Sequence, residues 1–339
     1  MAKKKSYIRE SLSLLGATLP LLGLNALVYF GFFLVAVLWI GFWGVLAALG
    51  FWIHFIAGWV PIIIGLGSFW WIWRMARRYF LYLVKGAHIA AITEIMCGRD
   101  VPRGMAQIKY GRSVVEKYFK DVSILFGVDI LVRAAVKKVT GTVVRLVNWL
   151  PLPGNARKLL NVIRQIINKS LDYVDAAILS YAIRQGSQNV WQSARHGVIL
   201  YAQSYKGILM TAAKAWGIGK VLDLLVFVMA MVPVVALTAV AGDEVGTVVF
   251  IVGLILAGIF AKIVELAVYE PFANAYVIVT YHRETENLQP DPEWDQKLQG
   301  MSNKFKELVG KAENFEPAEG DAAPALPSGQ EKAQAAAEV

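Results

Sequence analysis

Residues 21–73 read LLGLNALVYFGFFLVAVLWIGFWGVLAALGFWIHFIAGWVPIIIGLGSFWWIW, and this stretch decides the class of the fold. It belongs to a run of 63 residues between Glu10 and Arg74 that contains no Asp, Glu, Lys or Arg. A helix that crosses the hydrocarbon core of a bilayer needs about 20 apolar residues at a rise of about 1.5 Å each. The run therefore predicts two membrane-spanning helices joined by a turn.

Basic residues on both sides of this stretch predict its orientation. They are Lys3, Lys4, Lys5 and Arg9 before it, and Arg74, Arg77 and Arg78 after it. Cytoplasmic ends of spans collect Lys and Arg, so both ends are expected inside the cell and the number of crossings is expected to be even. Trp70, Trp71 and Trp73 adjoin the second basic cluster and are predicted to anchor the helix at the membrane–water interface.

The composition places the chain among membrane proteins. Hydrophobic residues make up 57% of it, well above the share in soluble domains. The apolar N-terminal run is too long for the core of a cleavable signal peptide, so it is expected to stay in the mature protein. The one cysteine, Cys97, excludes a disulfide and a Cys-based metal site within a single chain. We expect an all-α polytopic protein of the plasma (inner) membrane with both termini cytoplasmic.

The net charge of +9 is unevenly distributed along the chain. Residues 1–73 carry +3, residues 74–220 carry +16, residues 221–282 carry −4 and residues 283–339 carry −6. A basic segment beside membrane spans suits the anionic cytoplasmic leaflet, where each Lys or Arg contributes about 1 kcal/mol. Anionic lipid headgroups are therefore the expected partner. Nucleic acid is not expected, because the segment carries no recognisable binding motif.

Charge and turn signals divide the chain into six predicted segments. These are a basic cytoplasmic N-terminus (1–20), a transmembrane hairpin (21–83), a basic amphipathic helical region that is cytoplasmic or interfacial (84–217), a second transmembrane hairpin (218–283), a cytoplasmic helical extension (284–312) with a short surface helix over 297–309, and a disordered acidic tail (313–339). In the second hairpin, uncharged runs at 224–242 and 245–261 flank a turn at Asp243 and Glu244. Gly217 and Gly219 are interpreted as a helix boundary. Pro271 is expected to kink the last helix, which continues towards His282.

The middle region predicts long amphipathic helices over 105–148, 156–183 and 190–210, separated by a Pro/Gly turn at 151–155 and a polar break at 184–189. Asp129 and Arg133 lie four residues apart and can pair on one helix face. The helix that carries them is too short and too charged to span, so it is either buried in protein or dips shallowly into the interface.

Ionisable residues at the ends of the second hairpin are the candidate site. Asp223 lies one turn into its first span, with Lys220 three residues earlier, and Lys262 and Glu265 lie at the end of its second span. Charges near hydrocarbon are costly, so such residues pair with one another at the ends of spans or line a substrate or ion path. No catalytic, cofactor or metal motif accompanies them, and we expect neither an enzyme nor a cofactor.

Residues 171–282 contain three short motifs in a fixed order: LDYVDAAILSYAI at 171–183, Ser193-Ala194-Arg195, and KVLDLL at 220–225. In this order they resemble the choline transporter-like family of membrane proteins. The large extracellular cysteine-bearing loop of the family's animal members has no counterpart here, and no substrate-binding residue is carried over.

Two functions follow from these observations. The first is transport or permeation of a small solute, with organic cations as one class, by a homo-oligomer, because four spans alone make a poor path. The alternative is a non-transporting scaffold whose basic amphipathic helices bind or shape an anionic bilayer.

Overall fold

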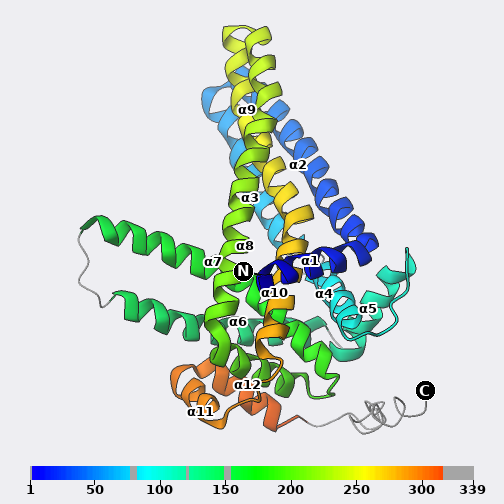
Figure 1. The fold of residues 1–339 in the computed structure, drawn as a ribbon. Coiled ribbons are helices and arrows are strands. Elements are labelled where there is room, and N and C mark those ends of the chain that lie inside the picture. Colours follow the sequence, from blue (N-terminus) through cyan, green and yellow to red (C-terminus); the bar gives the residue numbers. More distant parts are fainter. Residues whose placement is uncertain (1, 77–81, 120–121, 149–153, 316–339) are drawn as a thin grey trace. The chain divides into compact units, whose positions relative to one another are not determined.

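A computed structural model describes residues 2–76, 82–119, 122–148 and 154–315 of the chain. Over these residues the protein is all-α and contains no strand, as predicted (Figure 1). The helices are α1 (Ala2–Ala17), α2 (Leu19–Ile53), α3 (Phe55–Ala76), α4 (Tyr82–Met96), α5 (Ala106–Phe119), α6 (Val122–Asn148), α7 (Gly154–Gln185), α8 (Val190–Ala241), α9 (Asp243–Val264), the π-helix η2 (Glu265–Tyr269), α10 (Glu270–Thr285), α11 (Pro292–Met301) and α12 (Asn303–Glu313).

Residue contacts divide the chain into two compact units. Unit 1 comprises Met1–Val114 and Met210–Val279, and unit 2 comprises Val115–Leu209 and Thr280–Val339. Unit 1 therefore holds both apolar hairpins together with α1, α4 and α5 as far as Val114. Unit 2 holds most of the amphipathic helices that the sequence predicted between the hairpins.

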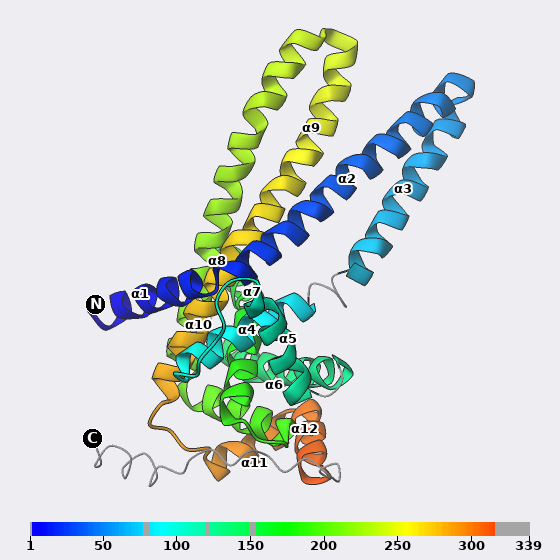
Figure 2. The same cartoon turned by 90° about the vertical axis from the view of Figure 1, so that its right-hand side faces the viewer.

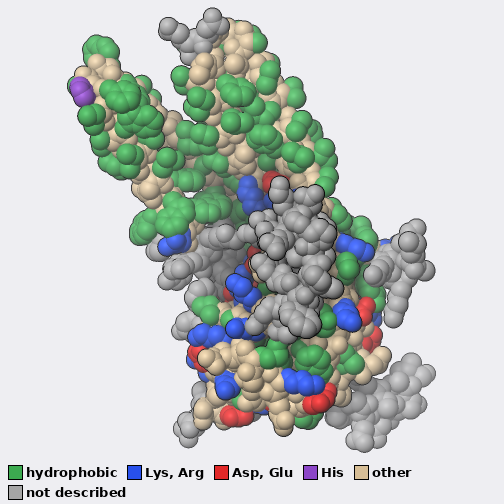
Figure 3. All heavy atoms as spheres, turned by 90° about the vertical axis from the view of Figure 1, so that its left-hand side faces the viewer, with side chains coloured by type: hydrophobic (Ala, Val, Ile, Leu, Met, Phe, Trp, Pro, Cys, Tyr) green, Lys and Arg blue, Asp and Glu red, His purple; other side chains and the backbone are tan. Residues whose placement is uncertain are grey.

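Four helical segments among the described residues are long and apolar enough to cross a membrane: Leu19–Ile53, Phe55–Arg74, Val190–Ala241 and Val245–Thr285. At most 17% of the most apolar window in any of them is buried inside the protein. Figure 3 shows hydrophobic side chains covering the hairpins. Because such a surface would be unfavourable in water, both hairpins belong in lipid, and the predicted class of fold is confirmed.

The two hairpin turns are made differently. Between α2 and α3 a single residue, His54, is extended (φ −163°) and interrupts the helix. Between α8 and α9 the turn is Gly242, with φ +76°. The predicted turn residues Asp243 and Glu244 instead begin α9. Glycine takes the turn because it adopts a positive φ without steric cost.

The interpretation of Gly217 and Gly219 as a helix boundary is wrong, because α8 passes through both of them. The irregularity in α8 is at Ser204, whose φ −118° and ψ 19° lie outside the helical region. Its hydroxyl donates a hydrogen bond to the carbonyl oxygen of Leu200 at 2.8 Å, a bond to the preceding turn that often bends helices.

The last apolar helix runs beyond Pro271, as predicted, and ends at Thr285 in α10. Its irregular part is the π-helix η2, which lies directly before Glu270 and Pro271. Further along, the prediction of a single surface helix over 297–309 is wrong in detail. Ser302 ends α11 and caps α12, because its hydroxyl accepts a hydrogen bond from the amide of Phe305.

Three predictions fall wholly or partly outside the described residues. Arg77 and Arg78 lie in the undescribed segment 77–81, and most of the turn predicted at 151–155 lies in 149–153. The predicted disordered tail falls outside them from residue 316 onwards.

Candidate functional site

The four ionisable residues predicted at the ends of the second hairpin lie together in unit 1. Lys220 Nζ is 2.9 Å from Asp223 Oδ2 and 3.0 Å from Glu265 Oε2. Lys262 Nζ also donates to Glu265 Oε2. The spacing in the sequence predicted the pairs Lys220–Asp223 and Lys262–Glu265, and both are present. The pair between Lys220 and Glu265, which joins α8 to η2, was not predicted.

Burial differs sharply within this group, which we name the Glu265 cluster (Lys220, Asp223, Lys262 and Glu265). The Glu265 side chain is 6% exposed, whereas those of Lys220 and Lys262 are 38% and 47% exposed. Two positive and two negative charges balance, and the buried carboxylate accepts from both ammonium groups. The long stems of the lysines reach outward, as expected of lysines that extend from the end of a span to water.

Glu265 begins the π-helix η2. Pro271, just after η2, creates the need for an additional hydrogen-bond donor to the backbone there. Proline has no amide hydrogen, so a carbonyl oxygen one turn before it lacks its helical donor. The side chain of Asn25, on α2, supplies the missing donor: its Nδ2 lies 3.0 Å from the oxygen of Ala267 and 3.2 Å from that of Leu266. Asn25 is 7% exposed. Asn25 was not among the predicted site residues, although it is the one carboxamide in the long apolar run.

Gly219 allows the close approach of α8 and η2. A Cβ atom at this position would lie 2.8 Å from a ring carbon of Tyr269. The ring can therefore pass α8, and its hydroxyl donates a 2.6 Å hydrogen bond to the carbonyl oxygen of Ala215. Close backbone approach, rather than a helix end, is the reason for glycine here.

Aromatic contacts show where three of the spans end relative to one another. Trp73 packs edge-on against Phe32 at 5.9 Å between ring centroids, and Phe33 packs against Phe260 at 5.4 Å. Arg74 and Lys262 thus lie at similar heights along α2. The guanidinium of Arg74 stacks on the ring of Trp70 at 3.7 Å, while Trp70 and Trp71 remain 58% and 61% exposed. This arrangement is typical of residues at a membrane boundary.

α2 is longer than a single membrane span needs. Its 35 residues correspond to about 52 Å at about 1.5 Å per residue, more than the ~30 Å of a bilayer core. The part that precedes Phe32 packs against η2 and the end of α9, in a core that includes Tyr29, Ile263 and Ala267. The long helix therefore links its span to the residues around the Glu265 cluster.

A second buried polar contact lies at the junction of α1 and α2. The hydroxyl of Thr18 donates to the carbonyl oxygen of Leu14 at 2.9 Å, and its oxygen lies 2.9 Å from Nε2 of His88 on α4. Because that hydroxyl hydrogen is used by Leu14, Nε2 of the imidazole is assigned as the donor to Thr18. Burial lowers the pKa of His88 to about 4, in keeping with a neutral ring.

In unit 2 the predicted pair Asp129–Arg133 is present at 3.7 Å. Arg133 lies closer, however, to two carboxylates of α7, those of Asp172 and Asp175. It joins α6 to α7 as well as stabilising its own helix. The neighbouring apolar residues Val128, Leu131, Val132, Ala135 and Val136 are all buried. Of the two interpretations of this helix, burial in protein is the one that these residues favour.

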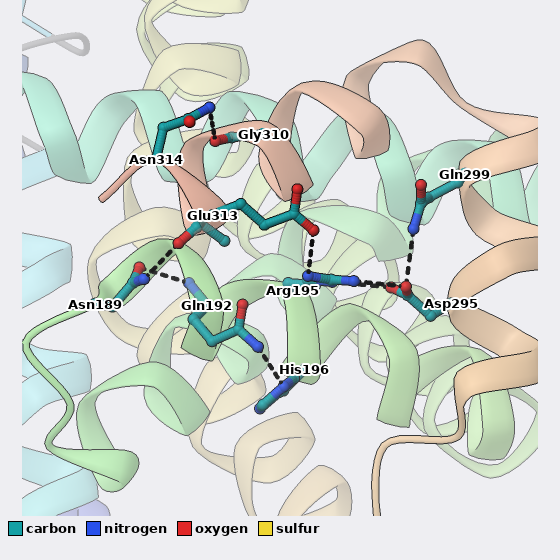
Figure 4. A network of polar contacts seen from close by, with 10 residues as sticks. Asn189, Gln192, Arg195, His196, Asp295, Gln299, Gly310, Glu313 and Asn314 are labelled. Atoms are coloured by element: carbon teal, nitrogen blue, oxygen red, sulfur yellow. Dashed lines mark hydrogen bonds and ion pairs between the residues drawn. The ribbon is translucent and has the colours of Figure 1, made fainter. Parts of the chain in front are cut away.

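Arg195, from the Ser-Ala-Arg motif, holds the C-terminal helices of unit 2 (Figure 4). Its Nε and Nη2 donate to the two carboxylate oxygens of Asp295 at 3.0 and 2.6 Å, and Nη1 lies 3.4 Å from Glu313. Burial alone would raise the pKa of Asp295, but the hydrogen bonds and charge of Arg195 outweigh it and hold that pKa below its ordinary value. This guanidinium is engaged by protein carboxylates.

Within the described residues, no group of three or more His, Cys, Asp or Glu side chains is arranged to hold a metal ion. The arrangement at the Glu265 cluster suits holding two helices together at the end of a hairpin. Comparison with protein-family models, with curated proteins and with solved structures finds no match to this chain, so the resemblance to the choline transporter-like family stays a prediction.

Proposed function

We propose that the protein is a non-transporting membrane scaffold that holds basic helices against an anionic bilayer surface. The observation that carries the proposal is the positive charge of the unit that holds the spans. The described residues of unit 1 contain 13 Lys and Arg against 8 Asp and Glu, a net charge of +5. Basic residues therefore accompany the membrane anchors within one unit.

The Glu265 cluster supports the same proposal. Its charges satisfy one another, so the residues proposed for a pathway do not present a spare carboxylate to a cation. Ionisable residues that mark pathways line a polar cavity within the membrane, whereas these lie beyond the ends of the apolar runs. In this proposal the membrane is the inner (plasma) membrane, with both termini in the cytoplasm.

Transport of a small solute is the second candidate, and one observation favours it. A buried carboxylate on a π-helix is the kind of local irregularity that is often found at functional sites. If the cluster opened in a homo-oligomer, Glu265 and Asp223 would become available to an organic cation.

Lipid selectivity tests the scaffold directly. The protein would be placed in nanodiscs of mixed phosphatidylcholine and phosphatidylglycerol, and the lipids retained on it measured by native mass spectrometry. We expect enrichment of phosphatidylglycerol. Reversing the exposed charges of Arg103 and Lys109 in unit 1 should lower that enrichment by about tenfold or more, since each contributes about 1 kcal/mol. The matched reversal of Lys304 and Lys306 in unit 2 should change it far less. Equal effects of both double variants would contradict the proposal.

Solute uptake tests the alternative. Reconstituted vesicles would be assayed across a panel of organic cations and other small solutes, with Asp223→Asn as the comparison. The scaffold predicts uptake no faster than in protein-free vesicles. Uptake that Asp223→Asn abolishes would overturn the scaffold in favour of transport.

The orientation of the protein in the membrane can be tested at Cys97, because it is the one thiol of the chain. A membrane-impermeant maleimide should label it in lysed cells and not in intact cells. Labelling of intact cells would contradict the proposed topology.

A further inference from the structure

The N-terminal helix α1 has three distinct faces along its 16 residues. One face is buried on the protein and consists of Tyr7, Ser11 and Leu14; the junction residue Thr18 continues it. A second, spaced by three and four residues, is apolar and turned outward: Ile8 and Leu12 are 40% and 53% exposed, and Leu15 is partly exposed. The third is polar and exposed and includes Arg9 and Ser13. Nothing in the described part of unit 1 covers the apolar face.

We propose that α1 lies flat in the headgroup region of the bilayer, with Ile8, Leu12 and Leu15 immersed among the acyl chains and Arg9 beside lipid phosphates. Helices of this kind bury their apolar face about 5–10 Å into the boundary between headgroups and acyl chains. The occupant of the apolar face is thus a lipid surface rather than a protein partner.

Continuity with the first hairpin supports a lipid occupant. Only Thr18 separates α1 from α2. Exposed leucines continue the apolar surface along α2, with Leu19, Leu27 and Leu34 at 60%, 71% and 62% exposed. No charged residue interrupts this surface. Figure 2 shows α1 running crosswise to the hairpin helices at their lower end, where a helix parallel to the membrane plane would lie.

Charge supports it as well. The segment before α2 contains Lys3, Lys4, Lys5 and Arg9 against one acidic residue, Glu10. Basic residues near a bilayer surface attract a helix to anionic lipid.

The junction is held so that α1 keeps one orientation. Thr18 is fixed by His88 on α4, and Gln107 of α5 donates a 2.9 Å hydrogen bond to the carbonyl oxygen of Ala17, at the last residue of α1. Helices α4 and α5 thus hold the end of α1 and direct its apolar face to one side.

The attraction of Arg9 to phosphates rests on the proposed function, whereas the immersion of the apolar face does not. The test therefore separates the two. In a Cys97→Ser background of the full chain, a fluorophore is attached to Leu12→Cys on the apolar face or to Ser13→Cys on the polar face. Val228→Cys, an exposed position of the span in α8 that is 55% exposed, reports correct insertion. Each protein is placed in vesicles with nitroxide-labelled lipid, made of phosphatidylcholine alone or mixed with phosphatidylglycerol.

We expect the label at Leu12 to be quenched at least about twofold more than the label at Ser13, because only the apolar face enters the boundary region. The difference should be present in neutral vesicles and larger with phosphatidylglycerol. If it is present but independent of phosphatidylglycerol, the immersion of α1 stands and the anionic preference of the proposed function fails. If Leu12 is quenched no more than Ser13 while Val228 is strongly quenched, the proposal is overturned. Self-quenching at Leu12 that is lost on dilution with unlabelled protein would likewise overturn it, by showing a second copy on this face.

Discussion

The spans of unit 1 and the polar residues beneath them are held by different kinds of contact. Within the spans, helices meet through glycines: a Cβ atom at Gly50 would lie 2.5 Å from the carbonyl oxygen of Ala57, and one at Gly253 would lie 2.3 Å from Val234. Below the spans, buried side chains make hydrogen bonds and ion pairs across helices. We name this second set the polar base; it consists of Thr18, Asn25, His88, Lys220, Glu265 and Tyr269.

The difference shows that the spans and the polar base are stabilised by different interactions. Shape complementarity and lipid hold the spans, together with a hydrogen bond of 3.0 Å from the Trp39 ring nitrogen to the carbonyl oxygen of Gly65. Directional bonds in the polar base fix which helices are neighbours, because an unpaired buried polar group costs free energy. Changes in the polar base should therefore lower stability through lost partners, and changes in the spans through steric conflict.

The largest expected effect is at Asn25. The substitution Asn25→Leu leaves the carbonyl oxygens of Leu266 and Ala267 without their donor and should destabilise the protein by about 2–4 kcal/mol, since each unpaired buried group costs about 1–3 kcal/mol. The free energy of unfolding in detergent micelles would be measured by denaturant titration. Leu27→Ala, at an exposed position of the same helix, is the control. A loss at Asn25 no larger than at Leu27 would contradict the role given to the polar base.

Steric conflict in the spans should be the next largest effect. Leucine at Gly253 must displace Val234, whereas leucine at Gly258, with no neighbour within 4 Å of its Cβ position, meets open space. The helix propensity gained is the same at both sites, so the difference in unfolding free energy isolates packing and should be about 1–3 kcal/mol. Equal stability of the two variants would show that the hairpin adjusts freely.

Lowering the pH should lower the free energy of unfolding, because His88 is protonated first in the unfolded chain. Its pKa is about 4 in the folded protein against about 6.5 in an unfolded chain. The unfolded state therefore takes up the proton first, and the stability present above pH 6.5 is lost as pH falls towards 4. Between pH 7 and pH 5 the loss should be about 2 kcal/mol, at about 1.4 kcal/mol per pH unit. His88→Gln keeps a donor for Thr18 without titrating, so its unfolding free energy should fall less over this range. Parallel pH profiles would refute the assignment.

The Glu265 cluster should show the smallest effect. Because its lysines reach solvent, Glu265→Gln is expected to cost about 1 kcal/mol rather than the 3–5 kcal/mol of a fully buried pair. Asp223→Asn, which leaves Glu265 in place, should cost less. A double-mutant cycle of Glu265→Gln with Lys220→Met should give a coupling energy of at least about 0.5 kcal/mol. A coupling of zero would mean that the pair between α8 and η2 adds nothing to stability.

The polar base also marks the limit of prediction from the sequence. The pairs Lys220–Asp223 and Lys262–Glu265 were predictable, because each lies within one helical turn. The contacts of Asn25 with Ala267 and of Thr18 with His88 were not, since they join residues 242 and 70 positions apart. The helix boundary at Gly217 and Gly219 was wrong for a related reason: a glycine that lets another helix approach looks the same in a sequence as a glycine that ends a helix.

The sequence by itself determined that this is an all-α protein of the membrane with two hairpins, because hydrophobic length and the absence of charge are local properties that a bilayer selects directly. It also determined which ionisable residues lie at the ends of the second hairpin. Only the tertiary structure decided that Glu265 is shared between two lysines, that Asn25 donates to the carbonyl oxygens of Leu266 and Ala267, and that α1 turns an apolar face outward. Each of these depends on which helices become neighbours, and that is decided by packing across long stretches of chain rather than by any one segment.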